Sequence, residues 1–170
     1  MTDSLITQYT DCLAQLRAVL EGLNDTDLDL TPVNGGWTIR QIVHHLADGD
    51  DLWKNCIKAA LGNAQCIFTL QWYWDVSQNV WAEKWHYARR AIGPALALLE
   101  MNRTSIAEIL RATPHALEQS VILHWRERNG VAQERATTVS YILESQTRHV
   151  IDHIAEIRKI RESHRPLMPG

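Results

Sequence analysis

The sequence predicts an all-α protein: a four-helix bundle with a long middle connection and a small hairpin before the last helix. Apolar residues recur at helical spacing in four stretches, and helix start and stop signals bound these stretches. The chain has 170 residues, of which 45% are hydrophobic, so we expect a single domain over residues 1–170 with a sizeable core. The four helices are expected over residues 4–23, 38–61, 93–113 and 138–162.

A loop separates the first two helices. Residues 24–36 contain Pro32 and a Gly-Gly pair, which interrupt the helical pattern. Thr38 is a suitable N-cap for the second helix, and Gln41 three residues later completes a capping-box pattern. Gly62 is the expected stop of this helix.

The long middle connection, residues 63–86, is rich in tryptophan and is expected to carry a short helix near residues 80–85. Five of the seven tryptophans lie between Trp53 and Trp85. Large aromatic side chains fill cores, and they also line pockets and anchor interfaces. We therefore place these tryptophans in the core first, with a pocket or a homodimer interface as the alternative.

A hairpin is expected between the third and fourth helices. Residues 120–125 form a short apolar run rich in β-forming residues, and Asn129-Gly130 is a turn signal. Residues 133–137 can form the returning strand, after which Thr138 is the N-cap of the last helix.

Composition argues against several classes of function. A net charge of -3 argues against a nucleic-acid-binding surface, which normally needs a basic stripe. No apolar stretch is long enough to cross a bilayer, and no apolar run follows a basic start, so we expect neither a membrane span nor a signal peptide. Cys12, Cys56 and Cys66 are an odd number without close pairs, so we expect small buried thiols in a reducing cytoplasm.

Two histidines on the last helix are the first indication of a site. His149 and His153 stand four residues apart, so they share one helical face and could bind one transition metal; the alternative is a hydrogen-bonded pair without metal. The second helix offers a third ligand. On a wheel of ~100° per residue, His45 lies at the edge of the apolar stripe, whereas His44 points further round, toward Asp48 and the solvent side. We therefore expect His45 to face another helix and His44 to lie on the surface.

The run G-W-T-I-R-Q-I-V-H-H-L-A-D, with the later H-V-I-D-H-I-A-E-I, resembles the DinB superfamily, most closely its YfiT-like branch. The similarity extends over most of the chain. It implies a four-helix bundle that holds one divalent metal with three histidines. By position, these ligands are His45, His149 and His153.

Three histidine ligands leave a metal position open, which is typical of a catalytic site. A metal there can lower the pKa of bound water, as in a hydrolase, or hold a thiol as the thiolate, as in an S-transferase or isomerase. The resemblance implies both, since the family is commonly labelled metal-dependent hydrolase while characterised relatives use low-molecular-weight thiols such as bacillithiol or mycothiol. The substrate is expected to be a small molecule. Zinc and nickel suit imidazole ligands best, and copper and iron stay open.

Other polar residues near the presumed ligands have two interpretations each. Gln146, one turn before His149, is a candidate substrate contact or a core polar group bonded to backbone. Asp48, Asp152 and Glu156 each follow a presumed ligand by three residues, so they either orient the imidazoles or are solvated helix residues. The remaining histidines are interpreted as surface or structural residues: His86, His115, His124 and His164.

Two non-catalytic alternatives stay open beside the enzyme. One is a metal-binding stress-response protein, and the other is a structural helical dimer. The sequence contains no recognisable nucleophilic serine motif, phosphate-binding glycine loop or dinucleotide fingerprint.

Overall fold

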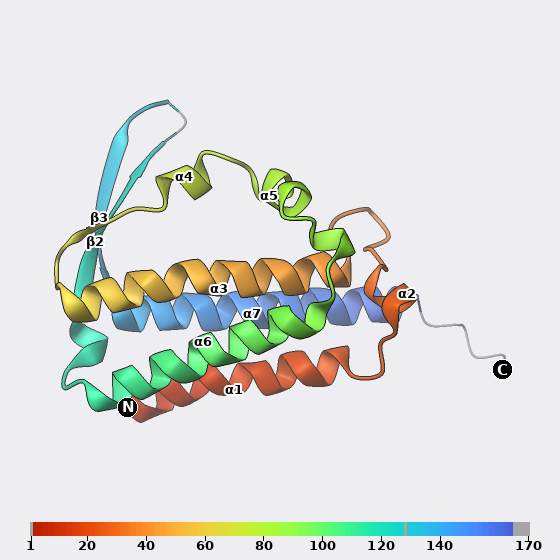
Figure 1. Cartoon of the computed structure of the whole chain (residues 1–170), viewed down its shortest axis with the longest axis horizontal. Coiled ribbons are helices and arrows are strands. Elements are labelled where there is room, and N and C mark those ends of the chain that lie inside the picture. The colour runs from red at the N-terminus through yellow and green to blue at the C-terminus, as the bar shows by residue number, and fades with distance from the viewer. Residues whose placement is uncertain (1, 128, 165–170) are drawn as a thin grey trace.

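The computed structural model, which describes residues 2–127 and 129–164, contains a bundle of four long helices (Figure 1). Helix α3 packs against α6 and α7, and α1 packs against α7 and α6. The predicted four-helix bundle is therefore confirmed. The four helices are α1 (Thr2–Leu20), α3 (Ile39–Gly62), α6 (Ile92–Ala112) and α7 (Val139–Ser163).

The ends of these helices follow local chemistry. Gln41 N–H donates to Oγ1 of Thr38 at 3.1 Å, and Thr38 N–H donates to Oε1 of Gln41 at 2.9 Å, so the predicted capping box is present. Helix α1 ends at Leu20, three residues earlier than predicted, because Gly22 adopts the left-handed conformation with φ +77°. Gly62 is the last residue of α3 and not its stop, and Asn63 caps the helix.

Short elements occupy the connections between the long helices. The middle connection arches over α3 in Figure 1, and its helix α5 begins two residues before the predicted short helix. The short elements are α2 (Asp25–Leu28), α4 (Gln71–Trp74), α5 (Gln78–Lys84), η1 (Tyr87–Arg89) and η2 (Ala116–Glu118).

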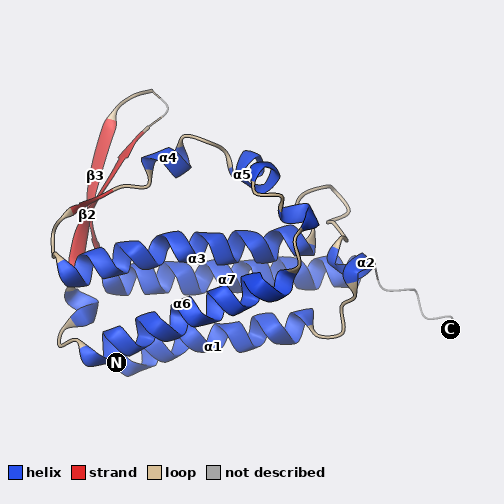
Figure 2. Cartoon of the chain, in the orientation of Figure 1, coloured by secondary structure: helices blue, strands red, loops and turns tan. Residues whose placement is uncertain are grey.

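The predicted hairpin is confirmed, and it belongs to a small three-stranded sheet (Figure 2). Strand β2 (Ser120–Arg126) pairs antiparallel with β3 (Ala132–Thr138), with Leu123 opposite Arg135. Strand β1 (Ile67–Phe68) pairs parallel with β2 and was not predicted, because two residues are too short to show a period.

The tryptophans between Trp53 and Trp85 do not fill the core, so that expectation is wrong. Trp72 is exposed, and the other four are half-buried. Along the middle connection the rings pack on one another, with Trp81 and Trp85 at 4.8 Å between centroids and Tyr73 and Trp81 stacked at 5.6 Å. Much of their apolar surface is thus covered by neighbouring rings of the same connection.

The apolar core consists of two clusters along the bundle. One surrounds Leu16, Ile42 and Ile157, and the other surrounds Ile106 and Leu143. Between them, at the same level on three helices, lies a polar layer of buried side chains: Asp50, Asn102, Arg103, Gln146 and Thr147. The bundle therefore carries a buried polar layer across its middle.

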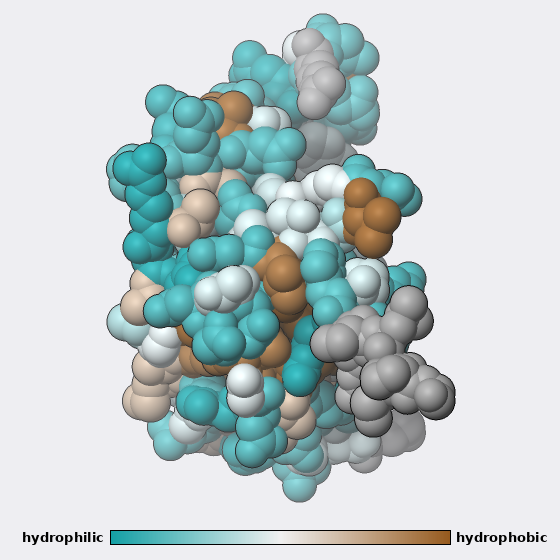
Figure 3. All heavy atoms as spheres, turned by 90° about the vertical axis from the view of Figure 1, so that its right-hand side faces the viewer, coloured by the Kyte–Doolittle hydropathy of each residue, from teal (hydrophilic) through white to brown (hydrophobic). Residues whose placement is uncertain are grey.

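The surface agrees with the composition. Hydrophilic side chains cover most of the face seen in Figure 3, and hydrophobic atoms show between them toward its centre. Among the described residues, no helix is long and apolar enough to cross a membrane. Cys12, Cys56 and Cys66 are free thiols, and the first two are buried as expected, whereas Cys66 is only half-buried.

Candidate metal centre

The three predicted histidines meet where α3 faces α7. One ring nitrogen from each of His45, His149 and His153 lies within 4.8 Å of the others. Nε2 of His45 is 3.0 Å from Nε2 of His149. The three pairs of rings are T-shaped, with interplanar angles of 87°, 77° and 67°.

This donor set fits a divalent transition metal. Zinc–imidazole bonds of about 2.0–2.1 Å in tetrahedral geometry place two ligand nitrogens roughly 3.3 Å apart. The pair of nitrogens at 3.0 Å is close to that spacing, and a nitrogen of the third histidine lies within 4.8 Å of both. Three imidazoles are also a donor set that zinc and nickel accept.

Burial keeps two of these imidazoles in the form that a metal needs. Burial first, and then the charges of His149 and His153, lower the pKa of His45 to about 3. Burial, followed by His153 and Arg103, lowers the pKa of His149 to about 4. Both rings are therefore neutral near pH 7, with a lone pair available for a metal.

A carboxylate orients the third imidazole. Nδ1 of His153 donates to Oε2 of Glu156 at 2.9 Å, which leaves Nε2 of His153 as its ligand atom. Of the two interpretations of Glu156, the orienting contact is thus the one that the structure shows. Asp48 instead lies 3.6 Å from the Arg90 guanidinium, and Asp152 has no hydrogen bond to the cluster among the described residues.

The structure corrects the prediction for His44. This side chain is 1% exposed and does not lie on the surface. Its Nε2 lies 3.2 Å from the backbone oxygen of Arg90, and its ring stacks on Tyr87 at 5.6 Å between centroids. The middle connection covers the face of α3 that the helical wheel left open, and His44 packs beneath it.

A hollow of about 340 Å³ opens beside the cluster, and its lining includes His149, Gln146 and Trp53. The Gln146 side chain is 5% exposed, and its backbone oxygen accepts a hydrogen bond from Arg103 at 3.1 Å. Gln146 therefore keeps both of its interpretations, as a core polar group and as a candidate substrate contact. The hollow gives a small molecule access to the side of the cluster formed by His149.

Sequence reasoning missed residues of α3 that complete this site. Gly49 and Trp53 follow His45 by four and eight residues, so they lie on the same helical face. A Cβ at Gly49 would be 3.9 Å from Cε1 of His149, an ordinary van der Waals contact, so position 49 lies directly beside that ring. The sequence signal for Gly49 and Trp53 was their spacing of four and eight residues from His45, which places them on the same face of the helix.

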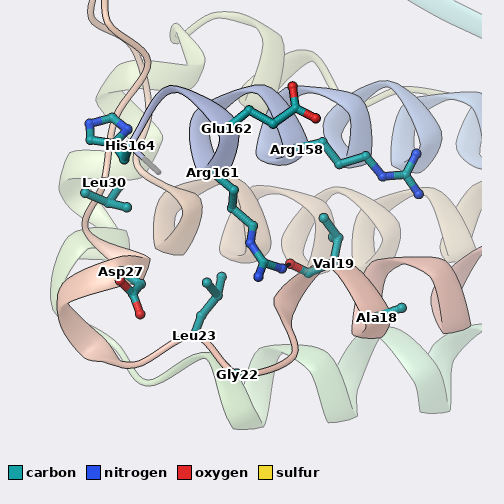
Figure 4. A pocket seen from close by; sticks show the side chains of 10 residues that line it. All are labelled: Ala18, Val19, Gly22, Leu23, Asp27, Leu30, Arg158, Arg161, Glu162 and His164. Carbon is teal, nitrogen blue, oxygen red and sulfur yellow. Dashed lines mark hydrogen bonds between the residues drawn. The ribbon is translucent and has the colours of Figure 1, made fainter. Parts of the chain in front are cut away.

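The remaining histidines lie outside the cluster, as expected. His115 is exposed, with Nδ1 3.6 Å from Glu118, and His124 is half-buried on β2. His164 lines a separate hollow of about 550 Å³ between the ends of α1 and α7, where Arg161 of α7 donates to the backbone oxygen of Val19 (Figure 4).

Comparison with known proteins agrees with this geometry. The DinB superfamily matches residues 8–157. A "putative metal-dependent hydrolase" of Geobacillus thermodenitrificans strain NG80-2 is 29% identical over 147 residues, covering 86% of this chain and 76% of the relative. A protein of the same description from Geobacillus kaustophilus strain HTA426 is 51% identical over 103 residues, which cover 61% of this chain and 55% of the relative.

Solved structures share the fold. YfiT from Bacillus subtilis, described as "a probable metal-dependent hydrolase with an unusual four-helix bundle topology", superposes with a TM-score of 0.77 at 23% identity, over 95% of this chain and 86% of that one. A mycothiol-dependent maleylpyruvate isomerase superposes with a TM-score of 0.67 at 15% identity, over 92% of this chain and 60% of that one. Because the family match spans nearly the whole helical bundle, the chain belongs to the DinB superfamily, beside the YfiT-like proteins.

Proposed function

We propose that the chain is a metal-dependent hydrolase in which His45, His149 and His153 hold one divalent transition metal, zinc or nickel. The observation that carries this proposal is the convergence of three ring nitrogens within 4.8 Å, beside a hollow that a small molecule can enter. The names of the Geobacillus relatives support it.

Each residue has a defined part in this proposal. The three imidazoles bind the ion, and Glu156 fixes the ring of His153 through the 2.9 Å hydrogen bond. A metal with three protein ligands lowers the pKa of a water or thiol that takes its open position, which supplies a nucleophile near neutral pH. Gln146 and Trp53 line the hollow and contact the substrate there.

A low-molecular-weight thiol is the second candidate for the activated group. The likeness in fold to a mycothiol-dependent isomerase supports it. The two candidates differ in what they consume: the hydrolase cleaves p-nitrophenyl acetate without added thiol, whereas the transferase joins a thiol such as glutathione to 1-chloro-2,4-dinitrobenzene. Both assays on zinc-loaded and nickel-loaded protein separate them.

The experiment for the metal centre is elemental analysis of protein purified without a histidine tag. We expect one equivalent of metal in the wild type and less than a tenth in His149→Ala. His44→Gln is the matched control, because His44 is the neighbouring buried histidine and makes no contact with the cluster. A wild type without metal, or equal loss in both variants, contradicts the proposal, and circular dichroism shows whether each variant is folded.

A further inference from the structure

Three hollows in the surface meet at one side chain, Trp53. The first is the hollow beside His149. The second, about 310 Å³, lies under the hairpin, and a narrow third of about 20 Å³ joins them. Trp53 contributes to all three, and Gln146 and Arg135 line the narrow part. The three hollows thus follow one another along Trp53, from His149 to the hairpin, with the narrow hollow sharing lining residues with each of the other two.

The far end of this row of hollows is aromatic. Its walls are Trp53, Trp74, Leu123 and Trp125, from α3, α4 and β2. The rings of Trp53 and Trp74 are 6.4 Å apart between centroids, tilted by 46°. Figure 1 shows how the arrangement arises, since the hairpin rises beside the end of α3 and α4 lies next to it. We call these four residues with Arg135 the tryptophan groove.

The side chain of Arg135 places a positive charge at this apolar end. Arg135 lies opposite Leu123 in the hairpin register, so both side chains project from the same face of the sheet into the groove. Its guanidinium carbon sits 4.9 Å from the centroid of the Tyr141 ring, which holds the charge near the groove floor. Among the residues that the structure describes, no carboxylate lies within ion-pair distance of Arg135.

We infer that the tryptophan groove binds the body of the substrate, and that this substrate is a small aromatic molecule with an anionic group, such as an aryl carboxylate. The indoles contact the aromatic ring, and Arg135 pairs with the anion. The reacting end then extends past Trp53 toward His149, so this inference rests on the proposed metal centre for the reaction but not for the binding.

The test is calorimetric binding of 1-naphthoate and of its neutral analogue 1-naphthamide to the full chain. We expect naphthoate to bind more tightly than the amide, and Arg135→Gln to weaken naphthoate about tenfold, since a charge-assisted hydrogen bond is lost. The affinity for the amide should change less than about twofold in the same variant. Arg126→Gln is the matched control, because Arg126 is an exposed arginine of the same hairpin on the opposite face of β2 from Leu123 and Trp125.

Trp125→Ala is the second variant, and it should weaken both ligands by a similar factor because it removes an apolar wall. Equal effects of Arg135→Gln and Arg126→Gln would overturn the inference, since the anion would then respond only to overall charge. Repeating the titration on His153→Ala separates the two proposals. Binding that is lost there and unaffected by Arg135→Gln places the carboxylate on the metal and overturns the groove, whereas Arg135-dependent binding that persists in His153→Ala supports the groove, and the metal content of the wild type decides the metal centre separately.

Discussion

The bundle contains two polar clusters about one helical turn apart, a buried one around Arg103 and a half-buried one of three histidines, and they differ in how their polar atoms are paired. In the first, each guanidinium nitrogen of Arg103 donates a hydrogen bond within the protein: Nε to Asp50 at 2.8 Å, Nη1 to the Tyr9 backbone oxygen at 2.7 Å, and Nη2 to the Gln146 backbone oxygen at 3.1 Å. Arg103 thereby contacts all four helices, since α6 carries it and its partners lie on α1, α3 and α7.

In the histidine cluster, His153 pairs with Glu156, but the other two rings meet each other. Nε2 of His45 and Nε2 of His149 face each other at 3.0 Å, and Nδ1 of His45 is buried without a hydrogen bond among the described residues. Asp50 also keeps one buried oxygen without a hydrogen bond, but its charge is balanced by Arg103.

The difference separates structural from functional polarity. A buried polar group is costly unless it is paired, so the charge-balanced Arg103–Asp50 pair with its backbone hydrogen bonds holds the four helices together, whereas ring nitrogens that converge from two helices are suited to bind a metal in common. The following changes test this distinction, from the largest expected effect to the smallest.

Removing the guanidinium should have the largest effect. Arg103→Met leaves Asp50 as an unpaired buried charge, and we expect the free energy of unfolding to fall by about 3–5 kcal/mol. Urea denaturation measures this loss. The double variant Arg103→Met with Asp50→Leu should recover most of it, because no charge is then buried. A loss below about 1 kcal/mol in the single variant would show that the cluster does not hold the four helices together.

Zinc should supply the partner that the histidines lack. A ligand at a thousand times its Kd stabilises the folded state by about 4 kcal/mol, so the melting temperature should rise on adding zinc and return with a chelator. His149→Ala should abolish this rise, whereas Arg103→Lys should keep it if the variant folds. A rise of equal size in wild type and His149→Ala would mean that zinc binds elsewhere.

Acid should destabilise the metal-free protein. The pKa values of His45 and His149, about 3 and about 4, lie below the unfolded value of ~6.5, so the unfolded chain binds more protons as pH falls below 6.5. At pH 5.5 each histidine should subtract about 1.4 kcal/mol, or roughly 3 kcal/mol for the pair. Urea titrations at pH 7.5 and 5.5 in the presence of a chelator measure this loss of unfolding free energy. His149→Gln should halve the loss of unfolding free energy between pH 7.5 and 5.5, because one of the two histidines with a lowered pKa is then absent.

The smallest effect is expected at the carboxylate that orients His153. Glu156→Gln keeps a hydrogen-bond acceptor but loses its charge, so zinc affinity should fall about tenfold, which corresponds to about 1.4 kcal/mol. Stability of the metal-free protein should change little, because Glu156 is partly exposed. A change in stability without a change in zinc affinity would assign Glu156 a purely structural part.

Local signals in the sequence predicted most of the fold. Helix periodicity, the Thr38 capping box and the Asn129-Gly130 turn act over a few residues, so they can be recognised without the tertiary structure. The wheel position of His45 also identified the histidine of α3 that faces α7, because that stripe depends only on the helix itself.

Features that depend on distant segments were missed. His44 was predicted on the surface because nothing local shows that Tyr87 covers it. The tryptophan groove needs α4 and the hairpin to meet over α3, which no periodicity encodes. Arg103, by contrast, was open to prediction, since it follows Leu99 by four residues and precedes Ile106 by three and so places a charge in an apolar stripe.

The sequence separation between the histidines also sets the order of assembly. His45 and His149 are 104 residues apart, so the ring of α3 is synthesised long before its counterpart on α7. Because domains generally fold as units during or after synthesis, the three rings come together only once α7 has docked. In the proposed metal centre, metal acquisition would therefore be a late event, since a nascent or truncated polypeptide lacking α7 would offer only one of the three histidines.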